Sequence, residues 1–387
     1  MSTFRIIEPG SDGAVIKVIG VGGAGGNAVN HMIARGVEGV EFIALNTDKQ
    51  ALSRSQAGRI IPLGDLGAGA DPGVGRTAAE SATEQIREAL NGANMVFLTA
   101  GMGTGTGTGA SPVIARIAKE LGILTVGVVT KPFHFEGTRK MAIAEAGIEQ
   151  LVEHVDSLIV VLNENLFAVM DEDASLEDAF KRADDVLHNA VAGIAEIINV
   201  PGLVNVDFAD VRTVMGEQGK AMMGIGEAAG VDRARLAAEQ AVASPLLDGV
   251  DLSGARGVIV NITATRALKL RETNDVINTI KAFCAEDATI IHGTVFEESM
   301  TDRLRVTVVA TGIGRRSPAA RPVLVAPVAR TGTDDGAPAR SQPNYGELEA
   351  PAVWRSPRAS AAAQVQALEE SGVERYDIPA FLRKQAD

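Results

Sequence analysis

The chain has 387 residues, 46% of them hydrophobic and only 4% aromatic, so it is long enough for more than one domain and its core is expected to be aliphatic. Its net charge of −13, without a basic stretch interleaved with aromatic residues, argues against nucleic acid as a partner. The single Cys284 cannot form an internal disulfide, and neither a secretion signal nor an apolar run of about 20 residues is evident. We therefore expect a cytoplasmic protein without direct membrane insertion.

Short β-branched runs alternate with longer amphipathic stretches in the first half of the chain. The runs lie at residues 14–19, 40–46, 95–100, 124–130 and 157–162. This βαβ rhythm predicts an α/β fold with a parallel, doubly wound sheet. A helix of about 24 residues follows, in which apolar residues recur every three or four positions until Pro201. A further helix over 233–242 and strands over 257–263, 289–295 and 304–311 predict a smaller second α/β domain.

Composition divides the chain into six segments. We expect a flexible N-terminus (1–13), the doubly wound domain (14–174), a central helix (175–200), the second domain (201–314), a proline-rich linker expected to be disordered (315–373) and a terminal peptide (374–387). In that peptide Ile378, Phe381 and Leu382 fall at i, i+3, i+4, and Pro379 suits a first helical turn. The spacing is typical of a docking peptide, although a frayed tail with a few apolar residues would look similar.

A glycine-rich loop at residues 20–27 follows the first strand and precedes a helix predicted over 28–34. Backbone N–H groups at a helix N-terminus can bind phosphate without a cationic side chain. Gly20, Gly22 and Gly25 also match the dinucleotide fingerprint. This loop alone therefore leaves open a nicotinamide or flavin site, a nucleoside phosphate site, or a tight structural turn.

A second glycine-rich loop at residues 100–109 also follows a strand and opens a helix predicted over 110–121. Both loops should lie at the carboxyl edge of one sheet and converge on one polyphosphate, with Thr104, Thr106 and Thr108 adding hydroxyl donors or a magnesium contact. A dehydrogenase has no need of this second loop. The P-loop pattern G-x-x-x-x-G-K-[ST] is absent, so backbone amides and helix dipoles would hold the phosphates.

The long helix carries Phe180 and Asp184, spaced i, i+4 on one face near its start. An aromatic ring can stack on a purine, and a carboxylate can accept from N1–H and the 2-amino group of guanine, neither of which adenine offers. The alternative is that Phe180 belongs to the apolar stripe and Asp184 to a solvated edge.

Asn205, Asp207 and Asp210 follow the long helix at a predicted helix start and could orient a water for hydrolysis. Asp207 could equally cap that helix. A helix of about 24 residues is about 36 Å long, so these residues could not reach their own nucleotide. They could complete the pocket of the next subunit, a heterologous contact that repeats as a filament.

At these residues the chain closely resembles the FtsZ/tubulin family, over essentially its whole length apart from the linker. Matching segments are 20–27, 46–48, 66–69, 100–109, 130–137, 205–215, 244–247 and 305–312. The resemblance implies a tubulin-like GTPase domain, a central helix and a C-terminal activation domain. It also implies GTP and GDP as ligands, Mg²⁺ held mainly by phosphates, GTPase activity that depends on polymerisation, and head-to-tail assembly into the bacterial cytokinetic (Z) ring at the division site.

The resemblance also implies roles for individual residues. The nucleotide-binding residues would be Gly22, Gly23, Ala24, Gly25, Gly26, Asn27, Asn46, Asp48, Ala68, Gly69, Gly103, Thr104, Gly105, Thr106, Gly107, Thr108, Glu136, Lys140, Phe180 and Asp184. Asn205, Asp207 and Asp210 match the family's synergy loop, which acts on the neighbouring subunit's GTP. The terminal peptide resembles one that docks on membrane tethers of the FtsA or ZipA type, through Asp377, Ile378, Pro379, Phe381, Leu382, Arg383 and Lys384.

The chain departs from the family pattern around the expected pocket. Thr104 replaces a usual glycine, where a β-branched residue would be strained if φ were positive. Lys140 replaces arginine, Leu162 replaces proline, and the segment 62–66 is shorter than usual. These departures leave a second hypothesis open, a nucleotide-dependent filament scaffold or regulator with little hydrolysis. An NAD-dependent oxidoreductase is the third.

Overall fold

The computed structural model describes residues 13–170, 174–199, 206–216, 219–247, 254–285 and 287–313, which contain one ten-stranded sheet in the order β3-β2-β1-β4-β5-β6-β7-β10-β8-β9. Six neighbouring strands are parallel: β3 (Arg59–Pro62), β2 (Val40–Asn46), β1 (Ile16–Val21), β4 (Met95–Gly101), β5 (Leu124–Lys131) and β6 (Ser157–Leu162). The strand order reverses between β1 and β4. Ligands of open α/β sheets bind at the carboxyl ends of strands at such a switch point.

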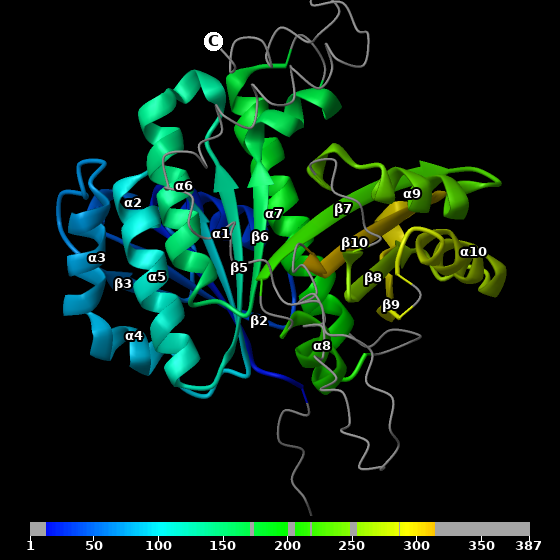
Figure 1. Cartoon of the computed structure of the whole chain (residues 1–387), viewed down its shortest axis with the longest axis horizontal. Helices are drawn as coiled ribbons and strands as arrows, with labels where there is room; N and C mark the ends of the chain where they lie inside the picture. Colours follow the sequence, from blue (N-terminus) through cyan, green and yellow to red (C-terminus); the bar gives the residue numbers. More distant parts are fainter. Residues whose placement is uncertain are drawn as a thin grey trace, which may run out of the picture. The chain divides into compact units, whose positions relative to one another are not determined.

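Helices cover both faces of this parallel part, as Figure 1 shows. The core on one face includes residues of α1 (Gly22–Ala34) and α7 (Leu176–Asn199). The core on the other face includes residues of α3 (Pro72–Ser81), α4 (Thr83–Leu90), α5 (Gly105–Glu120) and α6 (Thr138–Val152). A short α2 (Lys49–Leu52) follows β2. The predicted doubly wound α/β fold is confirmed.

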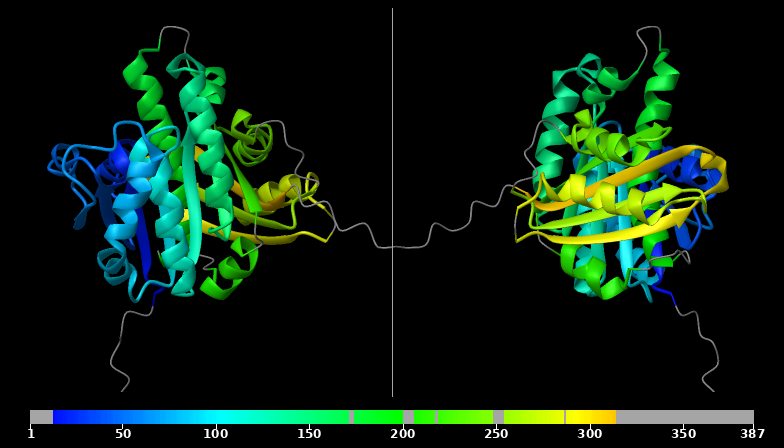
Figure 2. Two further views of the ribbon diagram at one scale, coloured as in Figure 1. Left: turned by 60° about the vertical axis from the view of Figure 1, so that its left-hand side comes forward. Right: turned by 90° about the vertical axis from the view of Figure 1, so that its right-hand side faces the viewer.

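The second half of the sheet is mixed. Strand β10 (Arg303–Ile313) is antiparallel to both β7 (Gly219–Ala229) and β8 (Gly257–Ala264), whereas β9 (Thr289–Phe296) is parallel to β8. Helices α9 (Arg233–Val242) and α10 (Leu270–Lys281) share a core with one face of these strands, and α7 covers the other face (Figures 1 and 2). Strands β6 and β7 pair over three residues, so the two halves share one sheet. The domain limits given above remain a prediction.

The predicted strands lie within two residues of those observed, whereas two helix starts were wrong. Helix α1 begins at Gly22 rather than residue 28, and α5 begins at Gly105 rather than residue 110. Glycine has low intrinsic helix propensity, and here close tertiary packing overrides it. Strands β3 and β7 were not predicted.

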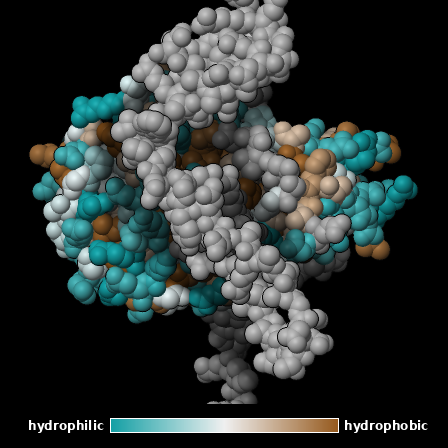
Figure 3. Space-filling model, in the orientation of Figure 1, coloured by the Kyte–Doolittle hydropathy of each residue, from teal (hydrophilic) through white to brown (hydrophobic). Residues whose placement is uncertain are grey.

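The remaining described elements are α8 (Phe208–Met215) and the 3₁₀ turns η1 (His134–Glu136), η2 (Asn163–Val169), η3 (Pro245–Leu247) and η5 (Glu298–Met300). The part of the surface visible in Figure 3 mixes hydrophilic and hydrophobic side chains. No helix among the described residues is both long enough and apolar enough to span a membrane.

Candidate functional site

The first glycine loop forms the start of α1. The residue before the helix is Val21, and no side chain caps the first N–H groups. Gly22 has φ of 73°, which favours glycine, and a Cβ added to it would lie 3.0 Å from the backbone N of Gly107 in the second loop. The first turn of α1 therefore presents amide groups to a ligand directly beside the second loop.

The second glycine loop forms the start of α5. Its residue Thr104 has φ of −109° and ψ of 166°, an extended conformation open to any residue. The strain considered for a β-branched residue here is therefore absent. The Thr104 hydroxyl donates to the carbonyl oxygen of Gly101 at 3.1 Å instead of capping α5. The first N–H groups of this helix thus also remain available for an anion.

Two threonines of α5 hydrogen-bond to residues that follow strands β2 and β4. The hydroxyls of Thr47 and Thr106 are 2.6 Å apart and buried, and the Thr108 hydroxyl accepts from the backbone N of Gly103 at 2.9 Å. A Cβ on Gly105 would lie only 2.7 Å from that of Ala68, so the segment around Ala68 packs directly on the second loop. The two loops therefore lie side by side, as the sequence predicted, and this segment packs against the second of them.

Three other predicted binding residues lie at turns around this convergence. Asn46 ends β2, and its Oδ1 accepts from the backbone N of Asp48 at 3.2 Å. The Asp48 carboxylate caps α2 through the backbone N of Gln50 at 2.8 Å. Gly69 has φ of 57° in the turn before α3. In this structure these residues therefore have local structural roles.

Glu136 and Lys140 contact each other. The Lys140 Nζ lies 3.1 Å from Oε2 of Glu136, and the other oxygen of Glu136 accepts from the backbone N of Phe133 at 3.0 Å. The backbone carbonyl of Lys140 lies close to Gly103, so the pair adjoins the second loop. To contact these residues through its ribose or phosphate, a nucleotide would therefore have to share or replace the ion pair between Glu136 and Lys140.

Phe180 and Asp184 lie near the start of α7, which packs against α1. The Phe180 side chain is 43% exposed and meets the buried Phe133 ring edge-on, with the centroids 5.6 Å apart. Phe180 is therefore not part of the buried apolar stripe and has an exposed surface for stacking. Burial, opposed by His31 and helped by the charge of Asp185, raises the pKa of Asp184 to about 6.

Asp207 and Asp210 lie at the other end of the parallel strands. Asp207 caps α8, with its Oδ1 accepting from the backbone N of Ala209 at 3.3 Å, so the capping role considered above is real. Both carboxylates are exposed. The Nη2 of Arg212 in α8 donates to the carbonyl oxygen of Gly122, just beyond the C-terminal end of α5.

Helix α5 separates these acids from the second glycine loop of their own chain. It has 16 residues and is therefore about 24 Å long, with the loop at its N-terminal end. Figure 1 shows α8 at the end of the sheet where β5 and β6 begin, away from their arrowheads. The acids and the glycine loops therefore face opposite ends of one subunit. Asn205 lies outside the described residues.

The predicted linker and docking peptide also lie outside the described residues. This applies to Asp377, Ile378, Pro379, Phe381, Leu382, Arg383 and Lys384.

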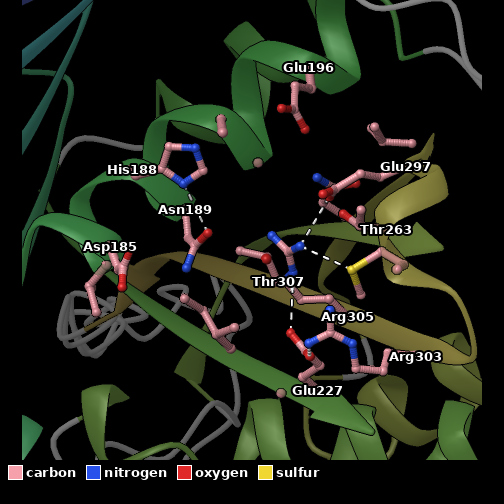
Figure 4. Close-up of a pocket in the computed structure, with 18 of the residues that line it drawn as sticks. Asp185, His188, Asn189, Glu196, Glu227, Thr263, Glu297, Arg303, Arg305 and Thr307 are labelled. Atoms are coloured by element: carbon pink, nitrogen blue, oxygen red, sulfur yellow. Dashed lines mark hydrogen bonds and ion pairs between the residues drawn. The ribbon is translucent and has the colours of Figure 1, made fainter. Parts of the chain in front are cut away.

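A separate cavity of about 990 Å³ lies between α7 and strands β7, β8 and β10, and no residue of the two glycine loops lines it (Figure 4). Helix α7 contributes His188 and Glu196, and β10 contributes Arg305 and Thr307. Burial, helped by the charge of Glu297, raises the pKa of Glu196 to about 7. The sequence pattern gave no indication of this cavity, because its walls come from segments far apart in the chain.

Comparison with known proteins places these features in a family. The family models described as "Tubulin/FtsZ family, GTPase domain" and "FtsZ family, C-terminal domain" match residues 15–171 and 219–314. The "Cell division protein FtsZ" of Pseudomonas aeruginosa is 53% identical over 99% of this chain and 100% of that protein, and that of Coxiella burnetii is 52% identical over 98% and 99%.

Solved structures agree with this assignment. An FtsZ dimer of M. jannaschii is 44% identical, with a TM-score of 0.76 over 78% of this chain and 89% of that one. CetZ2 from Haloferax volcanii, at 20% identity, has a TM-score of 0.66 over 78% of this chain and 94% of that chain and shares the fold. The chain therefore belongs to the tubulin/FtsZ family and is a GTP-hydrolysing cell-division protein of the FtsZ type, with that family's role in filaments and the Z ring.

Proposed function

We propose that the two glycine loops of one subunit hold the phosphates of GTP, and that Asn205, Asp207 and Asp210 of the next subunit orient the attacking water. The observation that carries this proposal is the separation of about 24 Å along α5 between Gly105 and the region of α8. A site divided in this way becomes complete only when subunits stack head to tail. Phosphate release and light scattering should therefore rise together above a critical protein concentration.

For the base, we propose that Phe180 stacks on the purine and Asp184 accepts from N1–H and the 2-amino group of guanine. The support is the exposed face of Phe180 and the position of Asp184 one turn later on α7. Asp184→Asn exchanges one acceptor for a donor, so it should weaken GTP binding and favour xanthosine triphosphate (XTP), whose C2 carries a carbonyl oxygen. Unchanged selectivity between GTP and XTP would contradict this contact.

The same variant allows a test of the shared site. Asp210→Ala should bind GTP but not hydrolyse it, and Asp184→Asn should bind GTP poorly while keeping its acids. The two variants are mixed with GTP and XTP present. If they mix randomly in the filament, about a quarter of all junctions place GTP bound to an Asp210→Ala subunit against the intact acids of an Asp184→Asn subunit. GDP should form. The matched control replaces Asp184→Asn with the double variant D184N/D210A, which should yield none.

If both variants co-sediment as polymer but the mixture produces no GDP, the acids do not have the proposed role. If Asp210→Ala instead loses GTP binding, the residue serves its own pocket. A polymer that forms with GTP and releases no phosphate in the unmodified chain would favour the scaffold hypothesis.

We propose Mg²⁺ as the metal partner of the nucleotide. Among the residues with described positions, no group of three or more His, Cys, Asp or Glu could hold a metal ion, whereas Thr106 and Thr108 offer hydroxyl oxygens beside the loops. This donor set fits Mg²⁺, which usually keeps several waters and binds through substrate phosphates and few protein oxygens. When bound, the ion would neutralise charge on the phosphates.

We further propose that the peptide 374–387 docks on a membrane tether of the FtsA or ZipA type and thereby brings the filament to the division site. The support is the i, i+3, i+4 spacing of Ile378, Phe381 and Leu382. Removing residues 374–387 should leave GTP-dependent assembly intact and abolish co-sedimentation with tether-bearing vesicles. Unchanged co-sedimentation would contradict the docking role.

A further inference from the structure

We propose that His31 and Asp185 form a positioning pair that fixes the direction and the charge of Asp184, and thereby sets how strongly guanine is recognised at a given pH. This inference rests on the guanine contact proposed above for Asp184. His31 and Asp185 would act through Asp184 and would not touch the base themselves.

The pair connects the helix that begins with the first phosphate loop to the helix that carries the base contact. Oδ1 of Asp185 on α7 lies 2.8 Å from Nε2 of His31 on α1 and 2.7 Å from Nη2 of Arg35, the residue that directly follows α1. The side chains of His31 and Asp185 are each only about a fifth exposed. The contact therefore holds α7 to α1 in a partly desolvated position, where such a bond is stronger than on the open surface.

Asp184 depends on this contact for its direction. No hydrogen bond from a described residue contributes to the charge state of its carboxylate. Adjacent residues on a helix project in different directions, so anchoring Asp185 toward α1 adds to the core packing of α7 in holding the side on which Asp184 projects. A one-turn change in this anchoring would move the carboxylate away from the base.

The charge of Asp184 depends on the same neighbours. Burial raises its pKa, Asp185 raises it further, and His31 is the group that lowers it. Arg35 is bonded to Asp185, and Arg182 and His188 line the adjacent cavity with Asp185 (Figure 4). Burial lowers the pKa of His188, which favours its neutral form, so this ring offers little compensating charge. Without His31, a larger fraction of Asp184 would be protonated and would lose an acceptor for guanine.

The test measures GDP affinity of the full chain from pH 5.5 to 8.5. His31→Gln keeps a donor but removes the imidazole ring, and we expect the pH at which GDP affinity falls to move upward by about half a pH unit, which is about threefold weaker binding on the acidic side. His31→Arg supplies a donor and a permanent positive charge and should prevent this upward shift. Asp185→Asn should weaken GDP binding at neutral pH because it disturbs the direction of Asp184, and it should move the pH at which affinity falls downward because it removes the like charge.

A structural bridge without a role in recognition would lower thermal stability in His31→Gln and leave both the pH profile and the preference for GDP over IDP unchanged; that result would overturn the proposal. Asp184→Asn distinguishes a failure of the positioning role from a failure of the guanine contact. If it removes the preference for GDP over IDP while His31→Gln shifts nothing, only the positioning role fails. If Asp184→Asn itself leaves the preference unchanged, the base contact is wrong and the positioning role fails with it.

Discussion

Asp184→Asn should make the nucleotide-free protein more stable at neutral and alkaline pH. The pKa of Asp184 is raised from 3.8 to about 6, chiefly by burial. At about 1.4 kcal/mol per pH unit, the ionised carboxylate costs about 3 kcal/mol in the folded state relative to its protonated form. Asparagine has nearly the same shape and no charge, so it should avoid this cost while disrupting the proposed guanine contact.

The sign follows from the raised pKa. Below pH 4 Asp184 is protonated in both the folded and the unfolded chain, and its contribution to stability is complete. As the pH rises from about 4 to about 6 the unfolded chain releases its proton more readily, so stability is lost, and above pH 6 the loss is constant. The free energy of unfolding of Asp184→Asn minus that of the original chain should therefore grow between pH 4 and 6 and then level off.

The assay is denaturant or thermal unfolding of nucleotide-free protein followed by circular dichroism across pH 4 to 8.5, with the difference between variants as the measured quantity. Asp210→Asn is the matched control, because Asp210 is exposed and such substitutions usually change stability by less than about 0.5 kcal/mol. A difference for Asp184→Asn that is negative, or that does not grow over this pH range, would refute the burial argument.

Three further outcomes follow from the geometry. Thr104→Gly should lower stability by about 1 kcal/mol without raising GTP affinity, because Thr104 is unstrained and holds Gly101; a gain in affinity, measured by nucleotide titration, would contradict this. Asp207→Ala should abolish hydrolysis and also lower the melting temperature, because it removes a helix cap of about 1 kcal/mol. Asp210→Ala should abolish hydrolysis with a smaller thermal effect. Equal shifts of the melting temperature in the two variants would contradict the capping role of Asp207. Gly75→Ala would bring a Cβ to 2.4 Å from the Gly105 carbonyl oxygen, so α3 must shift. We expect the free energy of unfolding to fall by about 1–3 kcal/mol and GTP binding to weaken. Unchanged GTP binding would show that this packing does not support the second glycine loop.

Local patterns in the sequence were sufficient to predict most strands but not the starts of the glycine-rich helices. Most residues of the runs that became β2 and β6 are β-branched or apolar, so their tendency to form strands is visible locally. Strand β7 is rich in glycine and alanine, and it is stabilised by pairing with β10, about 80 residues later in the chain. Such long-range pairing leaves no local signal.

The candidate site, too, could be predicted from the sequence only in part. The convergence of the two glycine loops could be predicted because each follows a parallel strand, and the carboxyl ends of parallel strands share one edge. The pairing of His31 with Asp185, 154 residues apart, could not, because each residue alone looks like a polar position on an amphipathic helix. The conformation of Thr104 likewise required backbone dihedral angles that its identity does not determine.

The opposed positions of the loops and the acids have a consequence for the whole filament. Under the proposed shared site, each subunit would offer a nucleotide at one end and carboxylates at the other, so a filament of n subunits would contain n − 1 completed junctions, and the nucleotide at one terminus would meet no acids. Hydrolysis per subunit must then increase with filament length and vanish for a single subunit. The terminal site would also differ from all others in being open to solvent. Nucleotide exchange and hydrolysis would then be separated in space by the same helix, α5, that separates Gly105 from the region of Asp210.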